Sequence, residues 1–297
     1  MSSTVHGVIA ASCTPFSEDG SPDASRLVKH VSHLLSSGCH HVLLFGTTGE
    51  GMSLSVEERM ATLDAVIDAG IEPTDLLVGT SACAMPDMVH LTRHAVQHGV
   101  AGELVFPPFH YASVSDDGVF ATYDRLIQDV GDEDMRLFFY HYPDLTGVDV
   151  SFPVIQRLLD AYGPQIAGVK DSGREWDHME VLCRSFPDLR VFAGTERYLS
   201  PILEQGGAGC ISATVNVTAP LARRVFDAAT AGTDVSEMQV ELSNLRMDIA
   251  QHPMIAAIKA LLSMQTGDDA WTRARPPTLP VGPKVRAKLE TLLTDLD

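Results

Sequence analysis

Short apolar runs alternate along this chain with stretches in which apolar residues recur every three or four positions. An apolar run of four to eight residues between turns is typical of a buried strand, and the longer spacing is typical of an amphipathic helix. Across 297 residues the alternation repeats eight times. The predicted strands are Gly7–Cys13, His41–Phe45, Leu76–Thr80, Glu103–Phe106, Arg136–Tyr142, Gln165–Lys170, Arg190–Ala193 and Ala208–Ala213.

The segments between these strands carry helix signals. Ser55 and Glu58 form a capping-box pattern, and Pro86 occupies a position typical of a first helical turn. Eight strand–helix pairs joined by right-handed crossovers predict an α/β fold, a closed (β/α)8 TIM barrel. An open doubly wound sheet is the alternative, but the first strand–helix turn, Thr14–Gly20, lacks a dinucleotide-binding fingerprint.

The chain continues beyond an eighth helix. We expect residues 1–232 to form the barrel with the active site, and residues 233–297 to form a C-terminal helical appendage. Within the appendage, one helical run from about Asp234 to Met264 is predicted, followed by proline turns and a last helix around Pro283–Leu296.

Composition narrows the classes of partner. A net charge of −18 argues against nucleic acid and anionic membranes. The N-terminus shows no secretory signal, and no apolar run approaches a membrane span, so a cytoplasmic protein is expected. The five cysteines are scattered without a CxxC pair, which favours reduced thiols over disulfides or a zinc site.

Lys170 is the first candidate for chemistry. It ends the sixth predicted strand, in a chain with only five lysines. Burial disfavours the charged form of a lysine, and a neutral amine can attack a carbonyl to form a Schiff base. The alternative is a strand-end lysine that reaches water or pairs with Asp171.

Other predicted strands of the barrel also end in polar groups. A barrel carries its active site at the carboxyl ends of its strands. Gly46–Gly49 offers hydroxyls and backbone N–H groups for a small carboxylate or oxyanion, although the glycines also suit a simple tight turn. Tyr140 ends the fifth strand, where its phenol can move a proton if it contacts a hydroxyl such as that of Thr47, or can simply pack.

In combination, Gly46-Thr-Thr-Gly-Glu50, Tyr140-x-x-Pro143 and the strand-borne Lys170 resemble the dihydrodipicolinate synthase and N-acetylneuraminate lyase family. Members of this family are pyruvate-dependent class I aldolases. The resemblance extends over nearly the whole chain. It implies a TIM barrel with C-terminal helices, usually a homotetramer, with no metal and no organic cofactor.

The resemblance also implies roles for individual residues. Lys170 is similar to the Schiff-base lysine, Tyr140 to the proton-shuttling tyrosine and Thr47 to its hydroxyl partner. Thr47 and Thr48, with Gly46 beside them, are similar to the groups that bind the pyruvyl carboxylate. Ile211 occupies the position whose backbone carbonyl faces the bound keto acid.

Departures from the family pattern bear on the second substrate. Leu145 stands where dihydrodipicolinate synthases present an arginine to a substrate carboxylate, and a leucine cannot bind a carboxylate. Arg197, after the seventh strand, is expected to place a cation near the distal end of the substrate, suggesting a sugar acid or another anionic tail. The alternative is that Arg197 pairs with Glu196 or a surface acid.

One relay position is ambiguous. The family commonly has a tyrosine after Pro-Pro-Phe that a neighbouring subunit donates, whereas this chain has His110 followed by Tyr111. Either residue is a candidate for that role. His141, next to Tyr140, is expected to point to the opposite side of its strand and to be structural.

Together these features predict a lyase that cleaves or forms the C3–C4 bond of pyruvate-derived 2-keto-3-deoxy sugar acids, with an aldehyde or keto acid as second substrate. Dihydrodipicolinate synthase is an alternative that Leu145 disfavours. A dehydratase or hydratase-aldolase using the same imine is another. A non-catalytic binding protein is disfavoured because Lys170 and Tyr140 are both present.

Overall fold

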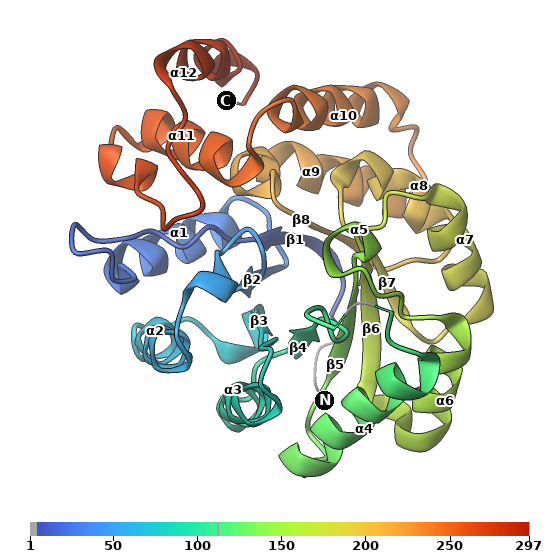
Figure 1. Ribbon diagram of the computed structural model, residues 1–297. Coiled ribbons are helices and arrows are strands. Elements are labelled where there is room, and N and C mark those ends of the chain that lie inside the picture. Colours follow the sequence, from blue (N-terminus) through green and yellow to red (C-terminus); the bar gives the residue numbers. More distant parts are fainter. Residues whose placement is uncertain (1–4, 112, 297) are drawn as a thin grey trace.

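The computed structural model describes residues 5–111 and 113–296, and its centre is a closed barrel of parallel strands (Figure 1). Neighbouring strands in the sequence are neighbours in the barrel, and β8 closes it by pairing with β1. The strands are β1 (Gly7–Ala11), β2 (His41–Leu44), β3 (Leu76–Gly79), β4 (Gly102–Val105), β5 (Leu137–His141), β6 (Ile166–Asp171), β7 (Arg190–Ala193) and β8 (Gly209–Ser212). The predicted fold is confirmed, and each predicted strand ends within two residues of the observed one.

Helices surround the barrel (Figure 1). The α-helices are α1 (Ala24–Ser36), α2 (Val56–Asp68), α3 (Met85–His98), α4 (Asp116–Val130), α5 (Pro143–Thr146), α6 (Phe152–Tyr162), α7 (Trp176–Ser185), α8 (Leu199–Glu204), α9 (Val215–Thr230), α10 (Ser236–Ala250), α11 (Met254–Thr266) and α12 (Pro283–Glu290). Short 3-10 turns are η1 (Gly51–Ser53), η2 (Pro73–Asp75), η3 (Gly163–Gln165), η4 (Glu196–Tyr198), η5 (Asp269–Thr272) and η6 (Leu293–Asp295). The predicted capping box is present: Ser55 accepts from the Glu58 amide, and Glu58 accepts from the Ser55 amide. Among the described residues, none of the helices has the length and apolar character needed to cross a bilayer.

Large side chains fill the inside of the barrel. Phe138 and Phe192 are fully buried there, with ring centres 6.1 Å apart. Gly168 on β6 makes room for Phe138, because a Cβ at residue 168 would lie 2.6 Å from that ring. The outer faces of the strands pack on the helices in a separate core. Strands buried on both faces require continuous apolar runs, which explains why the sequence showed them so clearly.

The C-terminal segment differs from the prediction in its helix bounds, and its last helix, α12, ends at Glu290 and not at Leu296. The expected single helix from Asp234 to Met264 is wrong, because α10 ends at Ala250 and α11 begins at Met254. Pro253 stands between them and lacks the N–H that a continuous helix requires. Helix α11 then packs against Trp271 and Leu289 in a third core. Residues on both sides of the predicted division after residue 232 line one cavity, described next.

Candidate active site

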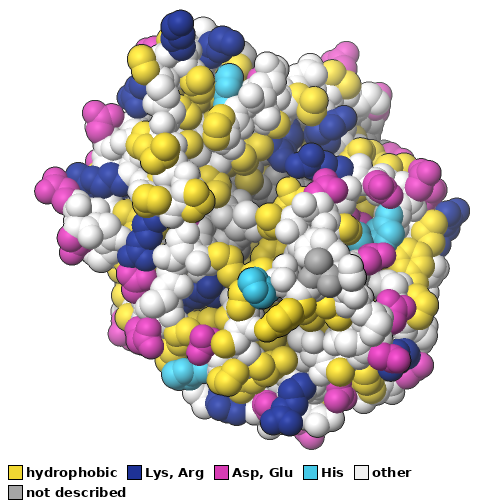
Figure 2. Space-filling model, in the orientation of Figure 1, with side chains coloured by type: hydrophobic (Ala, Val, Ile, Leu, Met, Phe, Trp, Pro, Cys, Tyr) yellow, Lys and Arg dark blue, Asp and Glu magenta, His cyan; other side chains and the backbone are white. Residues whose placement is uncertain are grey.

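A cavity of about 690 Å³ lies at the carboxyl ends of the strands. Barrel strands and the loops that follow them contribute Thr47, Tyr140, Lys170, Thr195 and Ala213 to its lining. The C-terminal segment contributes the opposite wall, with Arg246, Met254, Ile255 and residues 277–282. The space-filling view from the same side as Figure 1 shows this mouth of the barrel (Figure 2). Its size suits a small organic ligand.

Lys170 lies in this cavity at the end of β6 and is 4% exposed. Its Nζ atom is 4.1 Å from the centre of the Tyr140 ring on the neighbouring strand. Within the described residues, no carboxylate forms an ion pair with Lys170, so pairing with Asp171 is not observed. The other buried lysine, Lys259, is different: its ammonium forms an ion pair with Glu50 and donates to the Arg273 carbonyl at 2.8 Å. Of these two buried amines, Lys170 is therefore the one that faces open space.

Tyr140 is held by its neighbours. Its ring stacks on that of Phe106, with centres 4.2 Å apart, and its hydroxyl is 3.5 Å from the Thr47 Oγ1 atom. Burial raises the pKa of the phenol, but the charge of Lys170 and hydrogen bonds to Thr47, Lys170 and Ser172 lower it, and the net effect is a lowered pKa. A phenol with a lowered pKa gives up and takes back its proton more readily near neutral pH. The predicted grouping of Lys170, Tyr140 and Thr47 is what the structure shows.

The loop after β2 places its threonines by tight backbone packing. Positive φ values occur at Phe45 (56°) and Glu50 (53°), whereas the glycines serve close approach: a Cβ on Gly51 would lie 1.9 Å from the Phe45 carbonyl oxygen. Left-handed backbone at a non-glycine residue costs about 1–3 kcal/mol, which the surrounding contacts must offset. Thr47 and Thr48 line the cavity as predicted, while Gly46 shapes the loop behind them.

Glu50 anchors this loop to the C-terminal segment, a role that the sequence analysis missed. Its side chain, like that of Lys259 on α11, is almost fully buried, and the two form an ion pair. Glu50 also accepts a hydrogen bond from the Arg275 amide at 3.2 Å. A lysine within the apolar helix Met254–Thr266 was an available signal that a buried acid must lie nearby. The partner lies 209 residues earlier, so the pairing itself was not predictable.

Arg197 is not where the sequence analysis placed it. The residue lies on the short turn η4, is exposed, and is absent from the cavity lining. Its guanidinium carbon is 5.7 Å from the centre of the Tyr198 ring instead. The reason is that η4 turns the preceding residue, Glu196, into the protein, where it is fully buried, and directs Arg197 outward.

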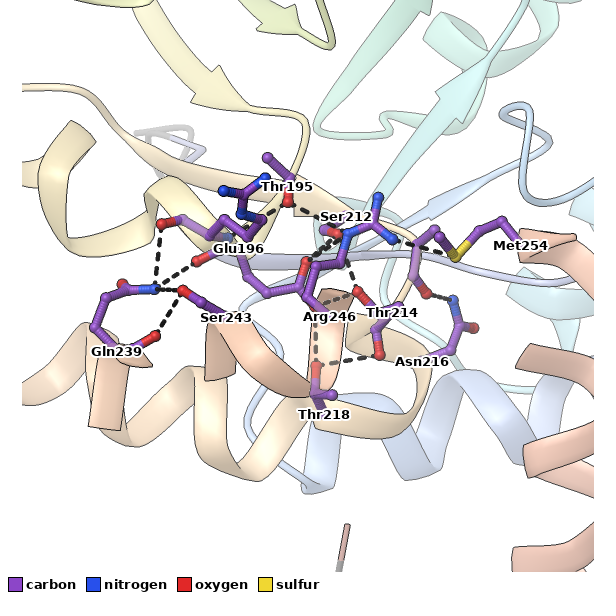
Figure 3. Close-up of polar contacts among 12 residues, drawn as sticks. Thr195, Glu196, Ser212, Thr214, Asn216, Thr218, Gln239, Ser243, Arg246 and Met254 are labelled. Carbon is purple, nitrogen blue, oxygen red and sulfur yellow. Dashed lines mark hydrogen bonds and ion pairs between the residues drawn. The ribbon is translucent and has the colours of Figure 1, made fainter. Parts of the chain in front are cut away.

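Arg246, and not Arg197, brings a guanidinium to the cavity lining. It comes from α10, lines the cavity, and contacts Thr195 and Met254 (Figure 3). A sequence signal existed: residue 246 lies four positions after Leu242 and three before Ile249, which are buried on one face of α10. An arginine on such an apolar face is expected to have a specific partner or ligand. Arg174, in the loop after β6, also lines the cavity.

The remaining predicted residues lie around or outside this cavity. Ile211 is fully buried inside the barrel and its side chain does not line the cavity. Leu145 is 52% exposed and lines a second cavity, of about 330 Å³, which shares Thr47 with the first. His110 and Tyr111 are exposed and line neither cavity, with their rings 5.3 Å apart.

His141 points away from the cavity, as predicted. Its ring stacks on that of His178 at 4.3 Å, and its Nδ1 atom is 3.1 Å from an Asp149 carboxylate oxygen. His178 in turn contacts Asp171 at 2.6 Å, and Asp171 accepts from the Gly173 amide. These contacts connect the loop after β5 to the end of β6, where Lys170 lies, and to the loop that follows β6. They hold the two strand ends together on the side away from the cavity.

Comparisons with known proteins agree with this geometry. The model of the dihydrodipicolinate synthetase family matches residues 4–296. An uncharacterized DapA-like lyase of Chloroflexus aurantiacus is 39% identical, covering 93% of this chain and 91% of that protein. A crystal structure described as dihydrodipicolinate synthase from Agrobacterium tumefaciens superposes with a TM-score of 0.89 at 34% identity, covering 98% of this chain and 99% of the other.

A further solved structure carries a ligand. The prophage protein YagE from E. coli K12, described as belonging to the dihydrodipicolinic acid synthase family, was crystallised in complex with pyruvate. It superposes with a TM-score of 0.88 at 25% identity and covers 99% of both chains. The chain described here therefore belongs to the dihydrodipicolinate synthetase family and is a lyase of that family.

Proposed function

We propose that this protein is a Schiff-base-forming aldolase that acts on pyruvate or on a 2-keto-3-deoxy sugar acid, cleaving or forming the C3–C4 bond. One observation carries the proposal: a buried lysine with no carboxylate partner among the described residues contacts a tyrosine of lowered pKa, and both line an open cavity. The pyruvate bound to the similar protein YagE supports the choice of keto acid.

The proposed reaction begins at Lys170. Its neutral amine attacks the C2 ketone of the substrate to give a carbinolamine, which takes up a proton from solvent and loses its oxygen as water, leaving a protonated imine. The C3–C4 bond then breaks and its electron pair moves into the imine, which becomes an enamine. Tyr140, in its deprotonated form and through Thr47 at 3.5 Å, takes the proton of the C4 hydroxyl as the aldehyde leaves. Protonation of the enamine at C3 and hydrolysis release pyruvate and free the amine of Lys170.

Thr47 and Thr48 are proposed to bind the C1 carboxylate of the substrate. Both line the cavity, in a loop whose glycines lie close to neighbouring backbone, and Thr48 is only 7% exposed. Hydroxyl and amide donors in a fixed loop suit an anion. The imine supplies the electron sink, so the proposed reaction needs no resident metal or organic cofactor. Prolonged dialysis against EDTA is therefore expected to leave activity unchanged.

Leu145 bears on which reaction is favoured. Its apolar side chain lines the second cavity together with Phe106 and Phe109, and offers no group for a substrate carboxylate. This disfavours dihydrodipicolinate synthase, in which a carboxylate-bearing aldehyde must be held near this loop. A sugar-acid aldolase remains the best match to the site.

A homotetramer is part of the proposal. His110 and Tyr111 lie outside the cavities of their own chain, and Tyr111 is 69% exposed. Exposure of this kind is expected for side chains that complete the site of a neighbouring subunit. Light scattering checks this: a mass near that of one 32.0 kDa chain would remove any such role for either residue.

The decisive experiment traps the imine. The protein is incubated with pyruvate and borohydride, and the reduced adduct is located by peptide mapping. We expect the adduct on Lys170, no adduct in Lys170→Met, and a normal adduct in Lys29→Met, whose lysine is exposed on α1. An adduct confined to another lysine, or none, would overturn the proposal. Product analysis with 2-keto-3-deoxy acids then separates C–C cleavage from loss of water.

A further inference from the structure

Arg246 lines the cavity but comes from helix α10, not from the end of a barrel strand. Its helix, α10, packs over the loop after β7, and its side chain is 17% exposed (Figure 3). The Nε atom donates to the Thr195 hydroxyl at 3.3 Å, and Nη1 contacts the Met254 sulfur at 3.3 Å. A thioether is a weak acceptor, so this second contact orients the guanidinium without satisfying it.

The carboxylate nearest to Arg246, that of Glu196, already accepts hydrogen bonds from other side chains. Glu196 is fully buried and accepts hydrogen bonds from the hydroxyls of Ser212, Thr214 and Thr218. Its distance to the Arg246 Nε atom is 3.8 Å, longer than a direct charged hydrogen bond. Figure 3 shows the carboxylate pointing into this hydroxyl cluster. Glu196 therefore balances the charge of Arg246 at a distance while leaving its remaining donors available.

Nη2 is the free end of the guanidinium. Among the described residues, it forms no hydrogen bond or ion pair, and Arg246 is part of the cavity lining. A second cation is close by: Arg174 also lines the cavity, and within the described part of the chain its one hydrogen bond is to the Tyr142 hydroxyl at 3.3 Å. Figure 2 shows a group of basic side chains below α10.

The overall charge of the protein makes this group unusual. At a net charge of −18, the surface repels anions, yet two arginines face one cavity. The acid that lines the same cavity, Asp171, is buried and bound to His178 and to the Gly173 amide. A local positive potential inside a low-dielectric cleft attracts and orients anionic ligands.

We infer that Arg246, assisted by Arg174, forms a second anion-binding subsite that holds a carboxylate or phosphate at the end of the substrate remote from the keto group. The inference rests on the proposed function, since it places the keto group at Lys170. It names the substrate class: 2-keto-3-deoxy acids with two anionic ends, in preference to those with a neutral hydroxyl tail.

Three substrates test this directly. They share a six-carbon 2-keto-3-deoxy backbone and end in a hydroxyl, a carboxylate or a phosphate. We expect Arg246→Met to raise KM for the preferred anionic substrate roughly tenfold to a hundredfold, the usual effect of losing a charged hydrogen bond. KM for the hydroxyl-ended substrate is expected to change less than about twofold, with partial recovery in Arg246→Lys. The carboxylate and phosphate arms identify which anion the subsite takes.

Arg197→Met is the matched control, because this arginine is exposed on η4 and lies outside the cavity. It is expected to leave all three KM values unchanged. Equal KM changes for neutral and anionic substrates in Arg246→Met, or a wild-type preference for the hydroxyl-ended acid, would overturn the inference. Arg174→Met is a second test variant that is not expected to disturb folding, because residue 174 is exposed in a loop. It is expected to raise KM for the anionic substrates and to leave KM for the hydroxyl-ended substrate unchanged.

The proposed subsite and the proposed aldolase chemistry can be refuted by separate experiments. Pyruvate has no tail, so borohydride trapping of pyruvate on Lys170 reports only on the proposed function and is expected to be normal in Arg246→Met. Calorimetric titration with inorganic phosphate and with succinate reports on the subsite through the part of the binding that Arg246→Met removes, because Thr47 and Thr48 offer a separate carboxylate site. Binding of either anion that Arg246→Met abolishes supports the inference even without an adduct. Binding of neither, in a protein that traps pyruvate normally, contradicts the inference alone.

Discussion

The Nζ atom of Lys170 lies 4.1 Å from the centre of the Tyr140 ring. The two residues meet because they are register partners on β5 and β6. Burial raises the pKa of the phenol, but the charge of Lys170 and hydrogen bonds outweigh that effect. A protonated imine would keep a positive charge at the same place. The proposed intermediate therefore keeps the pKa of Tyr140 lowered at the stage at which the deprotonated tyrosine takes the proton of the C4 hydroxyl.

Tyr140→Phe should separate imine formation from bond cleavage. Phenylalanine keeps the ring that stacks on Phe106 but removes the hydroxyl beside Thr47. We expect kcat for cleavage to fall by about 10²–10⁴, the usual contribution of a positioned proton-transfer group. Trapping of pyruvate on Lys170 should continue. Steady-state kinetics and mass spectrometry check the two halves, and an unchanged kcat would remove Tyr140 from the mechanism.

Breaking the Glu50–Lys259 ion pair should destabilise the whole fold. Both side chains are almost fully buried, and removal of one partner leaves an uncompensated charge in the core. We expect Lys259→Met to cost about 3–5 kcal/mol of unfolding free energy in urea titration. As a control, Arg125→Ala removes an exposed pair with Asp129 and should cost less than about 1 kcal/mol. Similar costs for the two variants would contradict this prediction.

Substitution by alanine should affect stability very differently at two glycines in the loop after β2. At Gly51 a Cβ would lie 1.9 Å from the Phe45 carbonyl oxygen, so the backbone must move. At Gly46 the nearest atom is a methyl carbon of the Leu43 side chain at 3.2 Å, which can shift. We expect Gly51→Ala to cost about 1–3 kcal/mol or more and to impair pyruvate trapping. Gly46→Ala should be nearly neutral in thermal denaturation, and equal effects of the two substitutions would contradict this prediction.

His178 should make stability depend on pH in a defined direction. Burial lowers the pKa of this imidazole, but its hydrogen bond to Asp171 and the charges of Asp171, Asp149 and Glu175 outweigh this, so the pKa is raised. The folded protein then binds the proton more tightly than the unfolded chain, whose histidines titrate near pH 6.5. The stabilisation is full below that pH and disappears as the pH rises through the folded value.

The corresponding measurement compares thermal unfolding of wild type and His178→Gln between pH 5.5 and 8. The difference in stability is expected to be largest at the acid end and to shrink as the pH rises. A gap that widens with pH would reverse the sign and contradict the account of the charges around His178.

The features that could be predicted well from the sequence are those that depend on residues close together along the chain. Strand ends were visible as apolar runs, and Lys170, Tyr140 and Thr47 followed because strand ends share one face of a barrel. Arg246 was missed because its position depends on how α10 packs on the loop after β7, 51 residues away along the chain. The break before α11 was readable at Pro253, but the helical pattern on both sides of it obscured the signal.

The cavity has two walls of different origin. The lysine, the tyrosine and the threonines belong to barrel strands and the loops that directly follow them, whereas Arg246 and residues 277–282 belong to the last sixth or so of the chain. Recombination between relatives that exchanged only this last stretch would leave the reacting groups intact and present them with a new wall. Such an exchange would change which substrate is bound without changing how its C–C bond is cleaved. In this architecture, evolution or a protein engineer can change substrate specificity by replacing the C-terminal wall alone.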